Sequence, residues 1–199
     1  MLKIGITGGI GSGKTTVSKI FQTLQIPSYN SDLAAKTILT SSALAKEKII
    51  ESFGKIILLE DGSIDRGKLG EIVFSSNSQL QRLNKILHPL VAIDFMEWCN
   101  NQRSSYLLKE AAILFETGIY KELDAVILVV SDLETRINRI KMRDGLSEKQ
   151  VLKRINSQME DNEKISLADY VIDNHGNKSL IPQVIKIHED LISRSAKRA

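Results

Sequence analysis

Residues 8–15 read Gly-Gly-Ile-Gly-Ser-Gly-Lys-Thr, which is the G-x-x-x-x-G-K-T pattern of a phosphate-binding loop. The glycines let the chain curl so that backbone N–H groups point at anionic oxygens, and the helix that follows adds its positive end. Lys14 can reach the β- and γ-phosphates of a nucleotide, and the Thr15 hydroxyl can ligate Mg²⁺. The pattern therefore predicts a site for a nucleoside triphosphate.

The residues on either side of this loop predict the strand, loop and helix that such a site needs. An apolar run over 3–7 precedes the loop. After the loop, apolar residues recur with the spacing of a helix at Val17, Ile20, Phe21 and Leu24. A glycine turn that caps an ordinary helix would not require the Lys-Thr pair or these flanking elements. A dinucleotide-binding site is excluded as well, because a G-x-G-x-x-G register that starts at Gly9 places Lys14 at its third glycine.

The composition is that of a globular protein, with 42% hydrophobic and 26% charged residues among 199. The net charge of +3 does not indicate nucleic-acid binding. No apolar run reaches membrane-spanning length, no signal segment begins the chain, and Cys99 is the only cysteine. We expect a cytoplasmic monomer or weak homo-oligomer with small-molecule substrates, no nucleic-acid partner and no membrane.

The segment from Ile26 to Tyr29 favours a short strand that ends in a polar turn with Asp32 at its tip. Ligands bind at the carboxyl ends of strands in open α/β sheets, so Asp32 would face the same crevice as the glycine loop. Alternatively, Asp32 caps a helix that begins at Leu33, as Asp does well. Position alone leaves both interpretations open.

Residues 33–104 change character, because helical patterns follow one another without a convincing buried strand. His88-Pro89 interrupts one of these patterns, which resumes at Val91. The segment favours a helical insertion in an α/β core, where a second substrate would bind. Arg66 and His88 stand at helix boundaries, where such residues are more often capping or surface residues than contacts with a ligand.

Three further strands are expected after the insertion. Residues 106–116 read as a buried strand with acidic residues near its end, and a carboxylate there, Glu110 or Glu116, is a candidate for Mg²⁺ or its water. The apolar run 125–130 is typical of a central parallel strand. Residues 170–173 form a last short strand, and the turn that follows it, 174–177, lies at the crevice end.

A basic segment follows the central strand. Between Arg136 and Arg154 there are seven Lys or Arg residues against two acids, Asp144 and Glu148. Such a run is usually a solvated helical face. In a protein with a phosphate loop, we interpret it as an arginine-bearing lid, since arginine can fork onto phosphate oxygens.

Several stretches together resemble one family, the dephospho-CoA kinases of coenzyme A biosynthesis. The resemblance is nearly full-length and in order, and it is carried by residues 6–17, 32–36, 61–66 with 69 and 73–74, 83–84, 88–89, 114–118, 143–147, 154–155 with 158–159, and 168–176. The glycine loop is shared by many NTPases. The D-G-x-I-D-R, H-P and L-F-E-T-G blocks are more specific in combination.

The resemblance implies an α/β, three-layer P-loop NTPase fold with a five-stranded parallel sheet, a helical substrate-domain insertion and a helical lid. The chain would be one kinase domain, 1–199. Its core would comprise 1–32, 105–132 and 168–199, its helical acceptor-binding insertion 33–104, and its lid 133–167.

The resemblance also implies a reaction, the transfer of the γ-phosphoryl group of ATP to the ribose 3′-hydroxyl of dephospho-CoA, with Mg²⁺ as cofactor. The catalytic aspartate of the family falls on Asp32, joined by Lys14 and by Arg143 with Arg136 or Arg139. The nucleotide would be bound by Gly9, Gly11, Ser12, Gly13, Lys14, Thr15, Thr16 and Asn174. The acceptor would be bound by Asp32, Arg66 and His88, and Thr15 would bind the metal.

This sequence departs from the family pattern at three positions. Asn30 replaces the first acid of a D-x-D pair, Glu110 replaces an Asp, and Ala112 replaces a proline. The Asn30 change removes a negative charge, which puts a metal role at that position in doubt, whereas the Ala112 change alters backbone stiffness more than chemistry.

Three other functions are alternatives for a protein with a phosphate-binding loop. A related kinase with another acceptor is the nearest. A GTPase would need a guanine-reading N-K-x-D, but the Asn-Lys pairs at 84–85 and 177–178 are followed by Ile-Leu and Ser-Leu. A nucleic-acid-dependent ATPase would need a longer core and a basic groove, whereas the basic excess lies on one short segment.

Overall fold

The computed structural model describes residues 1–198, although it describes only the backbone at Phe74 and Asn77. Two compact units make up the chain. The first comprises Met1–Asn30 and the chain from Gln102 on, and the second comprises Ser31–Asn101. The sequence predicted the insertion over 33–104, two to three residues from these limits.

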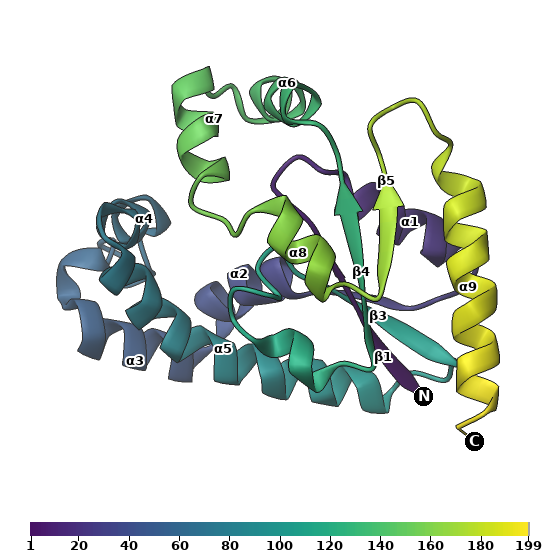
Figure 1. The fold of residues 1–199 in the computed structure, drawn as a ribbon. Coiled ribbons are helices and arrows are strands. Elements are labelled where there is room, and N and C mark those ends of the chain that lie inside the picture. Colours follow the sequence, from purple (N-terminus) through teal and green to yellow (C-terminus); the bar gives the residue numbers. More distant parts are fainter. Residues whose placement is uncertain (199) are drawn as a thin grey trace. The chain divides into compact units, whose positions relative to one another are not determined.

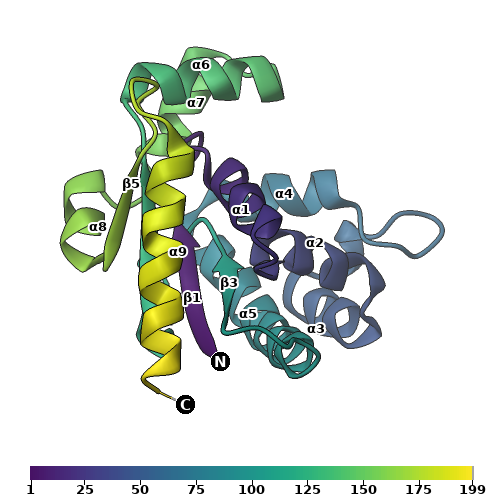
Figure 2. The ribbon, with the colours of Figure 1, turned by 90° about the vertical axis from the view of Figure 1, so that its right-hand side faces the viewer.

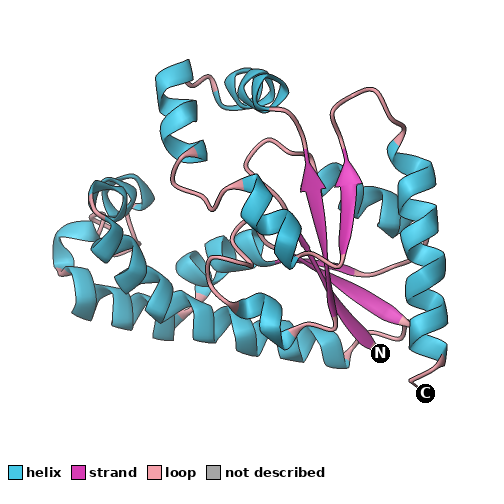
Figure 3. Cartoon of the chain, in the orientation of Figure 1, coloured by secondary structure: helices cyan, strands magenta, loops and turns pink. Residues whose placement is uncertain are grey.

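The first unit is built on a parallel five-stranded sheet with the strand order β2-β3-β1-β4-β5 (Figures 1 and 3). The strands are β1 (Leu2–Thr7), β2 (Ser28–Asn30), β3 (Tyr106–Glu110), β4 (Ala125–Val130) and β5 (Tyr170–Asp173). In the register, Ile6 lies opposite Glu110 on one side and Ile127 on the other. The central place of β1 puts the phosphate loop, which follows it, at the middle of the carboxyl edge.

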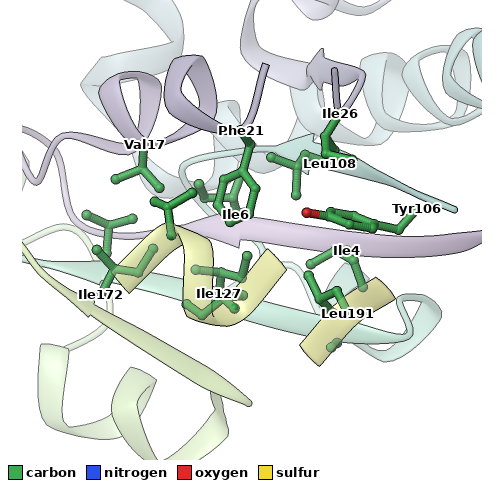
Figure 4. Close-up of a cluster of buried hydrophobic side chains, with 14 of the residues drawn as sticks. Ile4, Ile6, Val17, Phe21, Ile26, Tyr106, Leu108, Ile127, Ile172 and Leu191 are labelled. Carbon is green, nitrogen blue, oxygen red and sulfur yellow. The ribbon is translucent and has the colours of Figure 1, made fainter. Parts of the chain in front are cut away.

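One face of this sheet is covered by α1 (Lys14–Thr23) and α9 (Leu180–Ala196). Figure 2 shows α9 in yellow, lying lengthwise along the sheet. Alternate strand residues such as Ile4 and Ile6 meet Phe21 of α1 and Leu191 of α9 in one buried cluster (Figure 4). Because strand side chains alternate between faces, a central strand with both faces covered is apolar throughout, as β4 is.

The other face is covered by the segment after β3, including the 3-10 helix η2 (Ile119–Glu122), and by residues from the chain around α8 (Asp161–Leu167). Leu114 and Phe115 pack there against Val126 and Leu128. Between β4 and α8 the chain forms α6 (Leu133–Asp144) and α7 (Glu148–Ile155), and α7 opens with a capping box formed by Ser147 and Gln150.

The second unit is helical. It consists of α2 (Ser31–Ser41), α3 (Ala43–Phe53), the 3-10 helix η1 (Lys55–Ile57), α4 (Arg66–Ser75) and α5 (Asn77–Asn100). The long helix α5 contacts α2, α3 and α4. The core of this unit contains Ala45, Ile49, Ile57, Ile64, Leu69, Val73, Leu83 and Leu87.

Two boundaries differ from the sequence prediction. The strand expected over 106–116 ends at Glu110, since the chain then turns and Thr117 N–H bonds back to the Ile113 carbonyl. Pro89 lies inside α5 instead of interrupting it. A proline removes one helical hydrogen bond, but Leu87 before it and Leu90 after it both pack in the core, which outweighs that loss. Within residues 1–198 no helix is long and apolar enough to cross a membrane.

Candidate active site

The phosphate loop leaves the N-terminus of α1 open. Gly13 is the N-cap residue of this helix, with no side-chain cap, and its first turn holds no acidic residue. Five helices are capped by a side chain, from Ser42, Asp65, Ser76, Asp132 and Ser147, whereas α8 and α9 lack such a cap, as α1 does. In α1 this end directly follows the glycine loop, so its positive dipole end can stabilise an anion that the loop binds.

Asn174 holds this end of the loop from the carboxyl end of β5. Its backbone N–H donates to the Val130 carbonyl at 2.8 Å, and its side-chain Nδ2 donates to the Ser12 carbonyl at 2.7 Å. Gly13 has a φ of +100°, and a Cβ built there would lie 2.3 Å from Asn174 Nδ2. Asn174, predicted to bind the nucleotide, thus touches the loop itself and fixes its backbone.

Lys14 and Thr15 point to different partners. Lys14 Nζ lies back over the loop and donates to the carbonyls of Gly8 at 2.9 Å and Gly9 at 3.4 Å. The Thr15 hydroxyl donates to Glu110 Oε1 at 2.7 Å. Glu110 is buried at the end of β3, so the structure joins the predicted metal ligand to one of the two candidate carboxylates.

These groups fit ATP and Mg²⁺. The Thr15 hydroxyl and the Glu110 carboxylate are the hard oxygen donors that Mg²⁺ takes, alone or through its waters. Ser12 is buried, and its hydroxyl lacks a hydrogen-bond partner among the described residues, which a phosphate oxygen would supply. Within residues 1–198 no group of three acidic, His or Cys side chains forms a metal cage, so the phosphates would complete the coordination.

The opposite corner of the loop is held by side chains from α6 and from the segment between α7 and α8. Arg136 Nε donates to the Ile10 carbonyl at 3.0 Å, and Gln158 Oε1 accepts the Ile10 N–H at 2.8 Å. Arg139 Nη1 lies 3.3 Å from the Gly11 carbonyl and 3.4 Å from that of Ser12. The predicted lid thus contacts the phosphate loop directly.

Arg143, the lid residue predicted to be catalytic, is not joined to the loop by any hydrogen bond or ion pair recorded among the described residues. Its guanidinium forms a two-pronged ion pair with Asp144 at 2.7 and 2.9 Å, and the pair is exposed at the end of α6. The hydrogen bond to Asp144 raises the pKa of Arg143. Arg154 contacts the same carboxylate at 3.4 Å.

The turn after β5 carries a small charged cluster. Asp173 accepts hydrogen bonds from His175, and Lys178 Nζ lies 2.9 Å from its other oxygen. Lys178 first, and then His175, hold the pKa of Asp173 well below its usual range. Asp173 therefore keeps its charge beside Asn174 at neutral pH.

The predicted acceptor residues all belong to the helical unit. Asp32 lies in the first turn of α2, which begins at Ser31, so the alternative in which Asp32 caps a helix from Leu33 is wrong. Arg66 is the first residue of α4, after its N-cap Asp65. His88 lies in the middle of α5.

Sequence reasoning missed the role of Gln158 and the buried setting of Arg136. Residue types and spacing carry no signal for either, since Gln158 is 148 positions from the residue it binds. Gln158 does lie within the stretches that resemble the kinase family, which is the one pointer that the sequence offers.

Comparisons with known proteins agree with this geometry. A family model for dephospho-CoA kinase matches residues 2–179. Dephospho-CoA kinase from Carboxydothermus hydrogenoformans is 41% identical over 188 residues, which cover 92% of this chain and 91% of that protein. Dephospho-CoA kinase from Bacteroides fragilis is 35% identical over 187 residues, which cover 94% of this chain and 91% of that protein.

Solved structures give the same result. A crystal structure of a Thermus thermophilus protein aligns with a TM-score of 0.82 at 31% identity, covering 95% of this chain and 96% of that one. Dephospho-CoA kinase from Campylobacter jejuni aligns with a TM-score of 0.68 at 29% identity, and the alignment covers 96% of this chain and 98% of that one. Shikimate kinase from Acinetobacter baumannii, with a TM-score of 0.52 at 17% identity, shares the fold alone.

Proposed function

Since this chain belongs to the dephospho-CoA kinase family, it is an ATP-dependent kinase of coenzyme A biosynthesis, and we propose that it phosphorylates the ribose 3′-hydroxyl of dephospho-CoA as follows. The observation that supports this most strongly is the uncapped α1 behind a glycine loop, with Lys14 over the loop and Thr15 bonded to Glu110. We place the reaction in the cytoplasm, with ATP and dephospho-CoA as the only partners, in a monomer or weak homo-oligomer.

The loop residues hold the triphosphate. Backbone N–H groups of Gly9, Gly11, Gly13 and Thr16 surround its oxygens, and the Ser12 hydroxyl donates to one of them. Lys14 exchanges its loop carbonyls for the β- and γ-oxygens. Thr15 and Glu110 would hold Mg²⁺, the carboxylate either directly or through a water. The metal would supply positive charge that offsets the charge on those oxygens.

Asp32 positions the acceptor. As the second residue after Asn30, it stays close to the carboxyl end of β2 by covalent connection alone. There it orients the 3′-hydroxyl and takes its proton as the new bond forms. Arg66 and His88 contact the rest of dephospho-CoA. Asn30 supplies a polar but uncharged side chain, so the single carboxylate of Asp32 suffices as the base.

Arg143 completes the site when the lid closes. Its exposed guanidinium leaves Asp144 for the transferring phosphoryl group, where it stabilises developing charge and helps to exclude water. Arg139, already at the loop carbonyls, is the second arginine within reach of the phosphates.

The direct test is ADP release by purified protein with ATP, Mg²⁺ and dephospho-CoA, beside reactions without acceptor or with nucleoside monophosphates. ADP formation only with dephospho-CoA, with CoA as the second product, supports the proposal. Turnover with another acceptor would keep the phosphate-loop assignment and overturn the substrate.

The base is tested by Asp32→Asn. We expect it to bind ATP like the parent protein and to lose at least ~10²-fold in kcat, because a positioned base contributes about that much. Isothermal titration with ATP and steady-state rates separate the two effects. Near-normal turnover would remove Asp32 from the role of base.

A further inference from the structure

Both backbone polar groups of Ile10, at the corner of the phosphate loop, are bound by side chains from far along the chain. Gln158 accepts the N–H at 2.8 Å, and Arg136 donates to the carbonyl at 3.0 Å. These two contacts fix the orientation of the peptide planes on both sides of Ile10. Since the loop binds anions through its peptide N–H groups, that orientation decides where they point.

The same arginine explains why residue 9 is glycine. A Cβ built on Gly9 would lie 2.2 Å from Arg136 Nη2 and 2.5 Å from Cζ, a distance that real side chains do not reach. Gly9 is not among the glycines of this loop with positive φ. A side chain at position 9 would therefore have to displace the Arg136 guanidinium from the loop, whereas the backbone conformation of residue 9 would permit it.

Arg136 is itself held by a chain of alternating charges. Its Nη1 bonds to Asp161 Oδ2 at 2.8 Å, and the other oxygen of Asp161 lies 4.0 Å from Lys164 Nζ. Lys164 in turn lies 3.4 Å from Glu116 Oε1, which also accepts the Met159 N–H at 3.1 Å. Two cations and two carboxylates thus connect α6, α8 and the segment after β3.

Lys164 is the buried centre of this chain of charges. Its side chain is 1% exposed, and its Nζ has ion-pair partners but no hydrogen bond of good geometry among the described residues. Burying an ammonium is costly unless its counter-charges stay in place. A cavity of about 400 Å³ lies beside this chain of charges, and Arg136, Gln158 and Asp161 form part of its lining.

We propose that Arg136 and Gln158 are positioning residues that hold the Gly9–Ile10 corner of the phosphate loop in the shape that receives the triphosphate. Lys164 anchors Arg136 through Asp161, and it holds the Met159 backbone next to Gln158 through Glu116. The proposal deepens the kinase function proposed above and rests on the loop being its nucleotide site. Because the loop binds the triphosphate before and during transfer alike, loosening it raises the Kd and KM for ATP more than it lowers kcat.

Arg136→Lys is the sharpest test, because lysine keeps the positive charge for Asp161 but cannot fork to Ile10 as well. We expect the Kd for ATP, measured by titration calorimetry without acceptor, to rise about tenfold, the usual effect of losing one hydrogen bond from a charged donor. The kcat should stay within about threefold and the KM for dephospho-CoA should stay unchanged. Gln158→Leu should show the same pattern through the N–H side of Ile10.

Arg154→Lys is the matched control, since Arg154 belongs to the same lid and pairs only with exposed Asp144 among the recorded contacts. It should bind ATP like the parent protein. ATP affinity unchanged in both Arg136→Lys and Gln158→Leu would overturn the proposal. A loss confined to kcat would overturn it too, because Arg136 would then act on the phosphoryl group itself.

A double-mutant cycle in thermal unfolding adds a readout that needs no nucleotide. Gly9→Ala should lower the Tm in the parent protein but cause little further loss in Arg136→Ala, where the clash is gone. Additive losses would overturn the contact between these residues. The calorimetric titration with ATP and the Tm measurement involve no acceptor, so they remain valid if the dephospho-CoA assay fails. Equally, a negative result in these two measurements leaves the dephospho-CoA assay valid.

Discussion

At the N-terminal end of α6, the side chain of Arg136 is 6% exposed and bonds to both Ile10 and Asp161. At the C-terminal end the side chain of Arg143 is 62% exposed and bonds, among residues 1–198, to Asp144 alone. Both are arginines with a carboxylate partner. Only their surroundings differ: Arg136 lies between the phosphate loop and α8, and Arg143 lies in solvent where the helix ends.

This difference indicates two roles for arginines that look alike in the basic segment 136–154. Moving Arg136 would break a largely buried ion pair and expose the carbonyl of the loop, which is costly. An exposed pair such as Arg143–Asp144 contributes ~0–1 kcal/mol, so its arginine can move to another anion at little cost. In the proposed mechanism, the buried end of α6 therefore shapes the phosphate loop, and the arginine at the exposed end moves to the transferred phosphoryl group.

The largest effect should come from breaking the buried end at Lys164. Replacing Lys164 by Met keeps its length but leaves Glu116 and Asp161 without their shared cation. We expect the free energy of unfolding to fall by ~3 kcal/mol, as when one partner of a buried pair is removed. Denaturant unfolding measures this, and the Kd for ATP of the folded fraction should also rise.

The matched variant is Lys164→Met with Glu116→Gln, which removes one charge of each sign. It should recover at least half of the lost stability, because replacing both partners of a buried pair costs much less than removing one. No recovery would mean that Lys164 serves by its packing and not by its charge.

Local patterns predicted several elements, whereas the five-stranded parallel sheet was implied by the family resemblance. The apolar run 125–130 is β4, and the runs on either side of the phosphate loop are β1 and α1. The two errors, the strand drawn past Glu110 and the helix broken at Pro89, both concern boundaries. Apolar residues continue past the end of β3, so the sequence does not mark where that strand stops. At Pro89, packing in the core outweighs the tendency of proline to break a helix.

The site was predictable only where the loop motif itself specifies contacts. The motif predicts that Lys14 and Thr15 belong to the nucleotide site, and the family resemblance predicts that Asp32 is the catalytic base. The division of the lid arginines into buried and exposed ones did not follow, because Arg136 and Arg143 have the same chemistry and lie seven residues apart on one helix. Which of them meets Ile10 depends on how α6 packs, and that is set by residues more than 120 positions away.

Arg143→Ala tests the exposed end and should have the intermediate effect. We expect kcat to fall about tenfold or more, since a charge that meets the transferring group contributes in the transition state, while the free energy of unfolding changes by less than ~0.5 kcal/mol. Steady-state rates and denaturant unfolding of the same preparation decide this. If the free energy of unfolding fell by ~3 kcal/mol, as is usual for breaking a buried ion pair, the two ends of α6 would not differ in the way that their exposure suggests.

The smallest effect should come from Asp144→Asn, which removes the charge that holds Arg143 in solvent. Stability should stay within ~0.5 kcal/mol, because the lost pairs are exposed and a carboxylate at a helix C-terminus is itself unfavourable. If Asp144 only holds Arg143 between turnovers, kcat should stay within about threefold of the parent value. The dependence of kcat/KM on salt should also weaken, because a screened ion pair no longer competes with the phosphates. A loss of kcat as large as that of Arg143→Ala would show instead that Asp144 orients Arg143 for the reaction. The ion pair at the exposed end of α6 would then position an arginine, as the buried pair at the other end does.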